Sequence, residues 1–143
     1  MTTIRRTVTV AKPLEQVFDY LSDFTTTTQW DPGTVETVRV SGDGGVGTTY
    51  RNTSRFAGRE TQLTYVVERV VPGEVFALRG ENDTVVAHDT MTFRATGDRT
   101  EVTYVAEFEF NGLTRYLAPL LGPAFTRLGN EAEKGMREAL EKL

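Results

Sequence analysis

Hydrophobic and polar residues alternate along most of the first 110 positions, which is the pattern of half-buried β-strands. A first strand is predicted over residues 4–10, which are rich in β-branched side chains. Six more strands are predicted at residues 35–40, 48–56, 60–70, 74–81, 85–95 and 100–110. Because short turn segments separate these six, consecutive strands should pair as hairpins in an antiparallel meander.

Two segments have helical periodicity instead. A short helix is predicted by an apolar stripe at Leu14, Val17, Phe18 and Leu21. Residues 24–30 contain a run of threonines and are left open between a helical turn and a loop. Apolar residues from Leu113 to Leu143 form one stripe over about thirty residues, which predicts a long C-terminal helix. Pro119 and Pro123 predict a kink or a break in it near Gly122.

The order of elements predicts an α+β architecture. A seven-stranded sheet with one apolar face must cover that face, and the C-terminal helix is the one element large enough to do so. The chain has 143 residues, so we expect a single domain over residues 1–143. A strongly curved sheet wrapped around a helix can leave a hollow between the two layers.

Composition narrows the classes of function. The formal net charge of −4 argues against a nucleic-acid partner and against an anionic membrane surface. There is no cysteine and one histidine, so no disulfide or metal site is predicted. No run of eighteen apolar residues is present, so no stable membrane insertion is expected. The first residues show no apolar leader segment, from which we expect a cytoplasmic protein.

Strand parity singles out Asp89 as the candidate catalytic residue. In the strand at 85–95 the apolar side chains fall on odd positions, at Val85, Ala87, Met91 and Phe93. Asp89 shares that side, where a carboxylate must be paired or protonated. Asp89 either forms a structural hydrogen bond or acts on a ligand, as an anchor for it or as a general base. His88 should face solvent, which argues against a Ser-His-Asp triad.

Aromatic and polar residues of the inward rows are candidates for ligand binding. The predicted set is Trp30, Tyr50, Asn52, Tyr65, Tyr104, Phe108, Phe125 and Leu128. Plain core packing is an equally good interpretation of these residues. The segment 42–47 matches G-x-G-x-x-G, but a strand follows it where a dinucleotide site needs a helix, so no cofactor is predicted.

Five short segments follow one another at residues 13–24, 30–33, 45–50, 63–65 (with Glu68 and Pro72-Gly73) and 100–104. Taken in order, they resemble the helix-grip proteins of the START and Bet v 1-like superfamily, in particular the polyketide cyclase/dehydrase and lipid-transport branch. The resemblance implies a curved sheet around the C-terminal helix and an inner cavity for hydrophobic small molecules. It also implies that the glycine-rich loop at 42–47 borders the cavity mouth. It carries over no catalytic residue.

Three functions remain open at this point. The preferred hypothesis is binding of a hydrophobic small molecule, lipid or polyketide-like, in the internal cavity. The alternative is a cyclase/dehydrase that performs aldol cyclisation and loss of water, with Asp89 as base and Tyr65 or Tyr104 as donor. A weaker third is a protein-interaction or stress-response module with a vestigial cavity. We expect a monomer or a homodimer.

Overall fold

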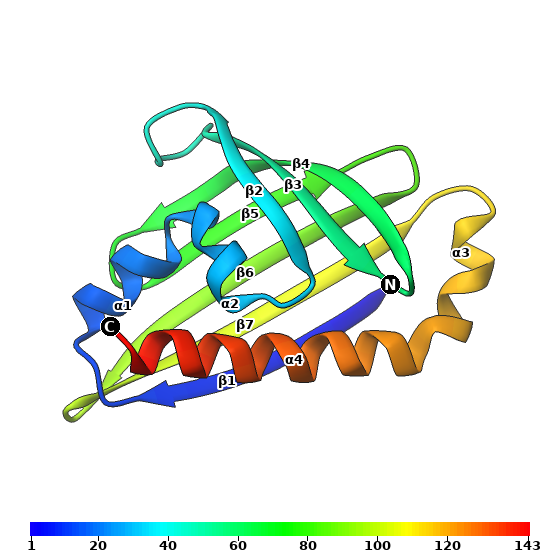
Figure 1. The fold of residues 1–143 in the computed structure, drawn as a ribbon. Helices are drawn as coiled ribbons and strands as arrows, with labels where there is room; N and C mark the ends of the chain where they lie inside the picture. Colours follow the sequence, from blue (N-terminus) through cyan, green and yellow to red (C-terminus); the bar gives the residue numbers. More distant parts are fainter.

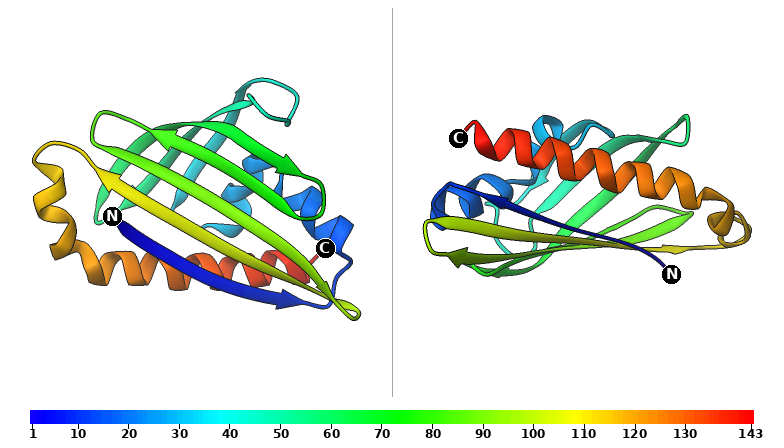
Figure 2. Two further views of the ribbon diagram at one scale, coloured as in Figure 1. Left: turned by 180° about the vertical axis from the view of Figure 1, so that it is seen from behind. Right: turned by 90° about the horizontal axis from the view of Figure 1, so that it is seen from below.

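A seven-stranded antiparallel sheet and a long C-terminal helix form the two layers of the computed structural model, which describes all 143 residues (Figures 1 and 2). The sheet order is β1-β7-β6-β5-β4-β3-β2. The strands are β1 Thr2–Val10, β2 Thr34–Ser41, β3 Thr49–Phe56, β4 Arg59–Val71, β5 Val75–Glu81, β6 Val85–Thr96 and β7 Arg99–Phe110. All seven strands are confirmed, and each predicted end lies within two residues of the observed one.

The segment left open between β1 and β2 is helical. After α1 (Leu14–Leu21) the chain forms a 3₁₀ turn, η1 (Phe24–Thr26), and one α-helical turn, α2 (Thr27–Trp30). The Asp23 carboxylate accepts a hydrogen bond from the Thr25 N–H at 3.1 Å and so caps η1. This capping, with threonine hydroxyls bonded back to the main chain, offsets the poor helix propensity of the threonine run.

The C-terminal segment packs on the sheet mainly along its second half, which corrects one expectation. The break near Gly122 is confirmed: the segment divides into α3 (Thr114–Leu117), η2 (Ala118–Leu121) and α4 (Gly122–Glu141). A proline lies in the first turn of both η2 and α4, where its missing N–H costs nothing. In the first half, Leu121 packs against the core, whereas the other three leucines, Leu113, Leu117 and Leu120, are 83%, 56% and 76% exposed.

Helix α4 lies across the inner face of the sheet, against β1 and α2 (Figure 2). Two glycines let it approach closely. A side chain at Gly129 would come within 2.8 Å of Ile4 in β1, and one at Gly135 would collide with the backbone carbonyl oxygen of Trp30 in α2. Leu140 and Met136 fill the far end of the helix face and are fully buried.

The core is unevenly distributed between the layers. The main cluster of 21 buried residues includes the apolar face of α1 and the C-terminal half of α4. A separate cluster of three, Ile4, Ala106 and Phe125, lies under the first half of α4. The interior between these two clusters is where the sheet and the helix leave space.

Candidate functional site

A cavity of about 610 Å³ lies between the inner face of the sheet and α4. Side chains from β1, β3, β4, β6, β7 and α4 line it, together with residues of α2, α3 and η2. The cavity reaches the protein surface beside α3 and η2, because the exposed Leu117 and Leu120 belong to its lining. Its volume is that of a site for one small organic molecule.

The structure brings together seven of the eight side chains predicted to bind ligand, and Asp89 with them. These seven are Trp30, Asn52, Tyr65, Tyr104, Phe108, Phe125 and Leu128. Tyr50 does not line the cavity. Its side chain is 1% exposed and packs edge-on against Phe24 at 5.7 Å between ring centroids. Tyr50 faces inward as its strand parity requires, but it lies where the main core has already closed the interior.

The glycine-rich loop at residues 42–47 also lies away from the cavity, so its expected place at the mouth is wrong. None of its residues belongs to the lining. The Gly47 N–H donates to the Val67 carbonyl at 2.9 Å, which holds the loop against β4. The mouth is formed at the opposite ends of the strands, where the β3–β4 hairpin supplies Arg55 and Arg59.

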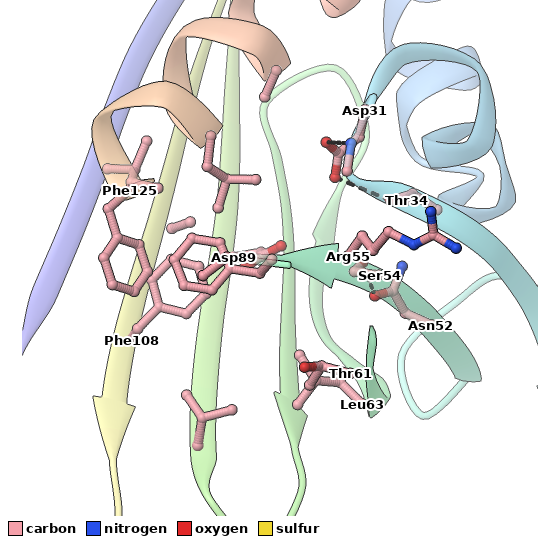
Figure 3. A pocket seen from close by; sticks show the side chains of 18 of the residues that line it. Asp31, Thr34, Asn52, Ser54, Arg55, Thr61, Leu63, Asp89, Phe108 and Phe125 are labelled. Atoms are coloured by element: carbon pink, nitrogen blue, oxygen red, sulfur yellow. Dashed lines mark hydrogen bonds between the residues drawn. The ribbon is translucent and has the colours of Figure 1, made fainter. Parts of the chain in front are cut away.

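Phenylalanines form the apolar wall near the mouth. Phe125 of α4 has its ring centroid 4.6 Å from that of Phe56, 5.3 Å from that of Phe108 and 5.8 Å from that of Phe110. Figure 3 shows Phe108 and Phe125 together on one side of the cavity, with Asn52, Ser54 and Arg55 on the other. Tilted aromatic rings of this kind offer faces and edges for the stacking of a flat or apolar ligand.

Asp89 lies inside the cavity on β6, paired with Leu78 of β5 and Ala106 of β7. It is 4% exposed. Its Oδ2 atom accepts a hydrogen bond from the Tyr104 hydroxyl at 3.2 Å, whereas Oδ1 has no partner in the protein. Burial raises the pKa of Asp89 to about 7, although the Tyr104 hydrogen bond acts in the opposite direction. The pKa of this carboxyl group therefore lies far above that of a free aspartate.

Three aromatic side chains of the lining lie in this part of the cavity: Tyr104 and Tyr65 are close to the carboxylate, and Trp30 packs against Tyr104. The Trp30 and Tyr104 rings meet edge-to-face at 5.7 Å. The Trp30 Nε1–H is buried without a hydrogen-bond partner. Burial, and then the nearby negative charge of Asp89, raise the pKa values of Tyr65 and Tyr104 well above that of free tyrosine. Both phenols therefore stay protonated and remain donors.

A second carboxylate of the cavity, Asp31, was missed by the sequence reasoning. It directly follows α2 and precedes the turn at Pro32 and Gly33, where no hydrophobic alternation indicates which side chains face inward. Its Oδ1 accepts from the Gly33 N–H at 3.1 Å and its Oδ2 from the Thr34 hydroxyl at 3.0 Å. Burial raises the pKa of Asp31, and these two hydrogen bonds partly oppose the rise. Its place directly after an inward-facing tryptophan was the available signal.

Asn52 belongs to a hydrogen-bonded network that is complete within the protein. Its Nδ2 donates to the Thr37 hydroxyl at 2.8 Å, and its Oδ1 accepts from the Ser54 hydroxyl at 2.7 Å (Figure 3). The Thr27 and Thr37 hydroxyls are bonded to each other at 2.6 Å. Because these buried groups form hydrogen bonds with one another, the network connects α2 to β2 and β3 and does not need a ligand.

The charged residues of the lining are two acids and two arginines. Asp89 and Asp31 have no cationic partner. Arg55 lies 3.9 Å from Glu60, with both side chains largely exposed. His88 is on the outer face of β6, 4.0 Å from Glu109, and contributes nothing to the cavity. No group of three or more acidic, histidine or cysteine side chains is arranged as a metal site.

A curved seven-stranded antiparallel sheet that holds a C-terminal helix over an apolar cavity is the helix-grip fold of START and Bet v 1-like proteins. The chain belongs to the family described as polyketide cyclase / dehydrase and lipid transport, which matches residues 1–143. No helix has both the length and the apolar composition needed to cross a membrane.

Solved structures share this fold at low sequence identity. The Zhui aromatase/cyclase from Streptomyces sp. R1128 is 19% identical with a TM-score of 0.83, over 99% of this chain and 94% of that one. A protein from Thermus thermophilus is 17% identical with a TM-score of 0.81, over 96% and 95%. A START superfamily protein from Mycobacterium smegmatis is 18% identical with a TM-score of 0.74, over 98% and 94%. No curated protein sequence matches the chain.

Proposed function

We propose that this protein binds a hydrophobic small molecule, lipid or polyketide-like, in the cavity between the sheet and α4. The observation that carries the proposal is the cavity itself, about 610 Å³ in volume with a wall of phenylalanines around Phe125. Membership of a family whose description includes lipid transport supports it. Residues 1–143 act as one domain in this proposal. A monomeric or homodimeric state and a cytoplasmic location stay predictions.

The energetics of such a site are favourable without any specific polar contact. Removing about 250 Å² of apolar ligand surface from water contributes roughly 6 kcal/mol. Loss of translational and rotational freedom offsets part of this gain. Removal of the apolar cavity wall from water and packing of the ligand against the phenylalanines add to the gain for a ligand that fills the cavity.

Filling the cavity with a side chain should weaken ligand binding. Thr61 of β4 lines the cavity, so in Thr61→Trp the indole should occupy the ligand's space and weaken the binding of a neutral apolar dye, Nile red, by about tenfold or more. Thr64→Trp places the same side chain on the exposed outer face of the same strand and should leave binding unchanged. Fluorescence titration measures both. Equal Nile red affinity in the two variants and the wild type would contradict the proposal.

A second candidate function, cyclisation of a poly-β-ketone chain, is favoured by one specific observation. The Asp89 carboxyl group has a pKa of about 7 and lies against the Tyr104 hydroxyl. A carboxylate with such a pKa can remove a proton beside a ligand carbonyl, and a phenol can donate to the enolate oxygen. The enolate carbon then attacks a second carbonyl and closes the ring, the resulting alkoxide takes the proton back from Asp89, and loss of water leaves a carbon–carbon double bond in the ring.

The test of this second function compares turnover with binding. A synthetic linear poly-β-ketone thioester is incubated with protein, and the product lacking one water is followed by mass spectrometry against the protein-free rate. Catalysis predicts acceleration by the wild type and its loss in Asp89→Asn, with Nile red affinity retained. A rate equal to the protein-free rate removes this candidate and leaves binding as the function.

A further inference from the structure

We propose that the inner end of the cavity is a subsite for a hydroxyl group of the ligand, which donates its hydrogen to Asp89 Oδ1 and accepts from Trp30 Nε1–H and the Tyr65 hydroxyl. This inference rests on the proposed binding function and adds the polar group that the ligand must carry. The ligand is then a lipophilic alcohol or phenol that enters with its hydroxyl end first.

The first argument is the placement of unpaired polar atoms. In the whole protein, two buried side-chain polar atoms lack a hydrogen-bond partner, Trp30 Nε1 and Asp89 Oδ1. Both residues line the same cavity and both contact Tyr104. A buried polar atom without a partner costs about 1–3 kcal/mol, so two of them in one place indicate a group that the protein itself does not supply.

The second argument is the balance of donors and acceptors. Tyr104 already gives its hydrogen to Asp89 Oδ2, and both oxygens of Asp31 accept hydrogen bonds from Gly33 and Thr34. In the ionised form of Asp89, Oδ1 therefore remains a free acceptor, and the same cavity holds two donors, Trp30 Nε1–H and the Tyr65 hydroxyl. A hydroxyl group offers one hydrogen and two lone pairs, which is the complementary set. An ammonium group has three hydrogens and no lone pair and would leave both donors unpaired.

The third argument is charge and depth. Asp89 lies four residues along β6 from Val85 at the mouth, about 13 Å at the usual rise of a strand. The arginines of the lining are on the β3–β4 hairpin at the mouth, whereas the acids Asp31 and Asp89 have no cation beside them. A ligand carboxylate at the inner end would be repelled by both acids, and its favourable place is the mouth.

The experiment uses three ligands of one shape against the whole protein: 2-naphthol, 2-methoxynaphthalene and 2-naphthoate. Methylation keeps the oxygen lone pairs and removes the hydrogen that Asp89 needs. At about pH 8, above the pKa of Asp89, 2-naphthol should bind the wild type about tenfold more tightly than the methyl ether, because a hydrogen bond to a buried charged group is worth at least that factor. The carboxylate should bind most weakly. Calorimetry or displacement of Nile red gives the three Kd values.

Two variants of β6 separate the subsite from general effects. Asp89→Leu removes the acceptor at similar volume, and the preference for 2-naphthol over the ether should fall to within about twofold. His88→Leu, on the outer face of the same strand, should keep the wild-type preference. If Asp89→Leu does not fold, the three Kd values of the wild type still test the hydroxyl subsite.

Different outcomes would overturn the hydroxyl subsite and the proposed binding function. Equal affinity of the wild type for 2-naphthol and its ether overturns the hydroxyl subsite and assigns the unpaired atoms to a bound water. A preference that persists in Asp89→Leu also overturns it. Failure of all three ligands and of Nile red to bind overturns the binding function itself.

Discussion

Asp89→Asn should stabilise the protein by about 4 kcal/mol at pH 9 relative to the wild type, while leaving stability at pH 4 nearly unchanged. Burial raises the pKa of Asp89 from 3.8 to about 7, so ionising this side chain in the folded state carries a desolvation cost. A rise of about three units in the pKa corresponds to a free-energy difference of about 4 kcal/mol. This is a large share of the roughly 5–15 kcal/mol that holds a typical domain folded.

The sign of this effect follows from proton linkage. Below about pH 4 the carboxyl group is protonated in both the folded and the unfolded chain, and its contribution to stability is fully present. Between about pH 4 and 7 the folded protein keeps the proton while the unfolded chain releases it, so the free energy of unfolding falls as pH rises. Above about pH 7 the carboxyl group is ionised in both states, so its effect on the free energy of unfolding no longer changes with pH. Asparagine does not titrate, so the variant lacks this component.

Urea unfolding of the wild type and of Asp89→Asn, measured from pH 4 to pH 9, tests this prediction. The difference between the two curves isolates Asp89, because other titrating groups contribute to both. Three ionisable groups face it from neighbouring elements, Asp31 after α2, Tyr65 of β4 and Tyr104 of β7, and all three have raised pKa values. Parallel curves would show that Asp89 ionises without cost.

Strand parity is the part of the site that could be predicted well. Alternation along β6 assigned Asp89 to the apolar side and His88 to the outer face, and the structure places them there. Parity works because the period of a strand is two and no bulge interrupts the pairing of β6 with β7. The strand ends were predicted to within two residues because turn residues, such as Pro72-Gly73 and Gly97-Asp98, mark them in the sequence.

Position along the strand could not be predicted in the same way. Tyr50 has the correct parity, yet it lies in the closed core beside Phe24 and not in the cavity. The mouth lies at the β3–β4 hairpin and α3, and the loop at 42–47 is at the other end. Which end of a curved sheet stays open depends on where helices cover it, and alternation contains no information on that.

The exposed leucines of α3 and η2 show a second limit of pattern reasoning. Leu113, Leu117 and Leu120 continue the apolar spacing of α4, but the break at Gly122 turns the chain away from the sheet. A periodic stripe states which residues share a helix face, whereas the direction of the helix decides whether that face meets a partner. Asp31 was missed for a related reason, because a turn motif does not say which interior it borders.

Gly135→Ala should destabilise the protein by about 3 kcal/mol and weaken Nile red binding. A methyl group at Gly135 would collide with the carbonyl oxygen of Trp30, which is backbone and cannot rotate away. The strain must therefore move α4 away from α2, and overpacking of this kind costs about 1–3 kcal/mol or more. Since Trp30 and Ala132 line the cavity from these two helices, the same movement changes the shape of the binding site.

Gly122→Ala is the matched control within the same helix. Nothing lies within 4 Å of a side chain at Gly122, which is the first residue of α4 and precedes Pro123, so alanine should there change stability by no more than about 0.5 kcal/mol. Urea unfolding of both variants gives the two free energies, and Nile red titration gives the effect on the cavity. If Gly135→Ala is as stable as Gly122→Ala, the close approach of α4 to α2 does not exist in solution. If it loses stability and binding together, the contact between one turn of α2 and one glycine of α4 sets the height of the cavity above the sheet.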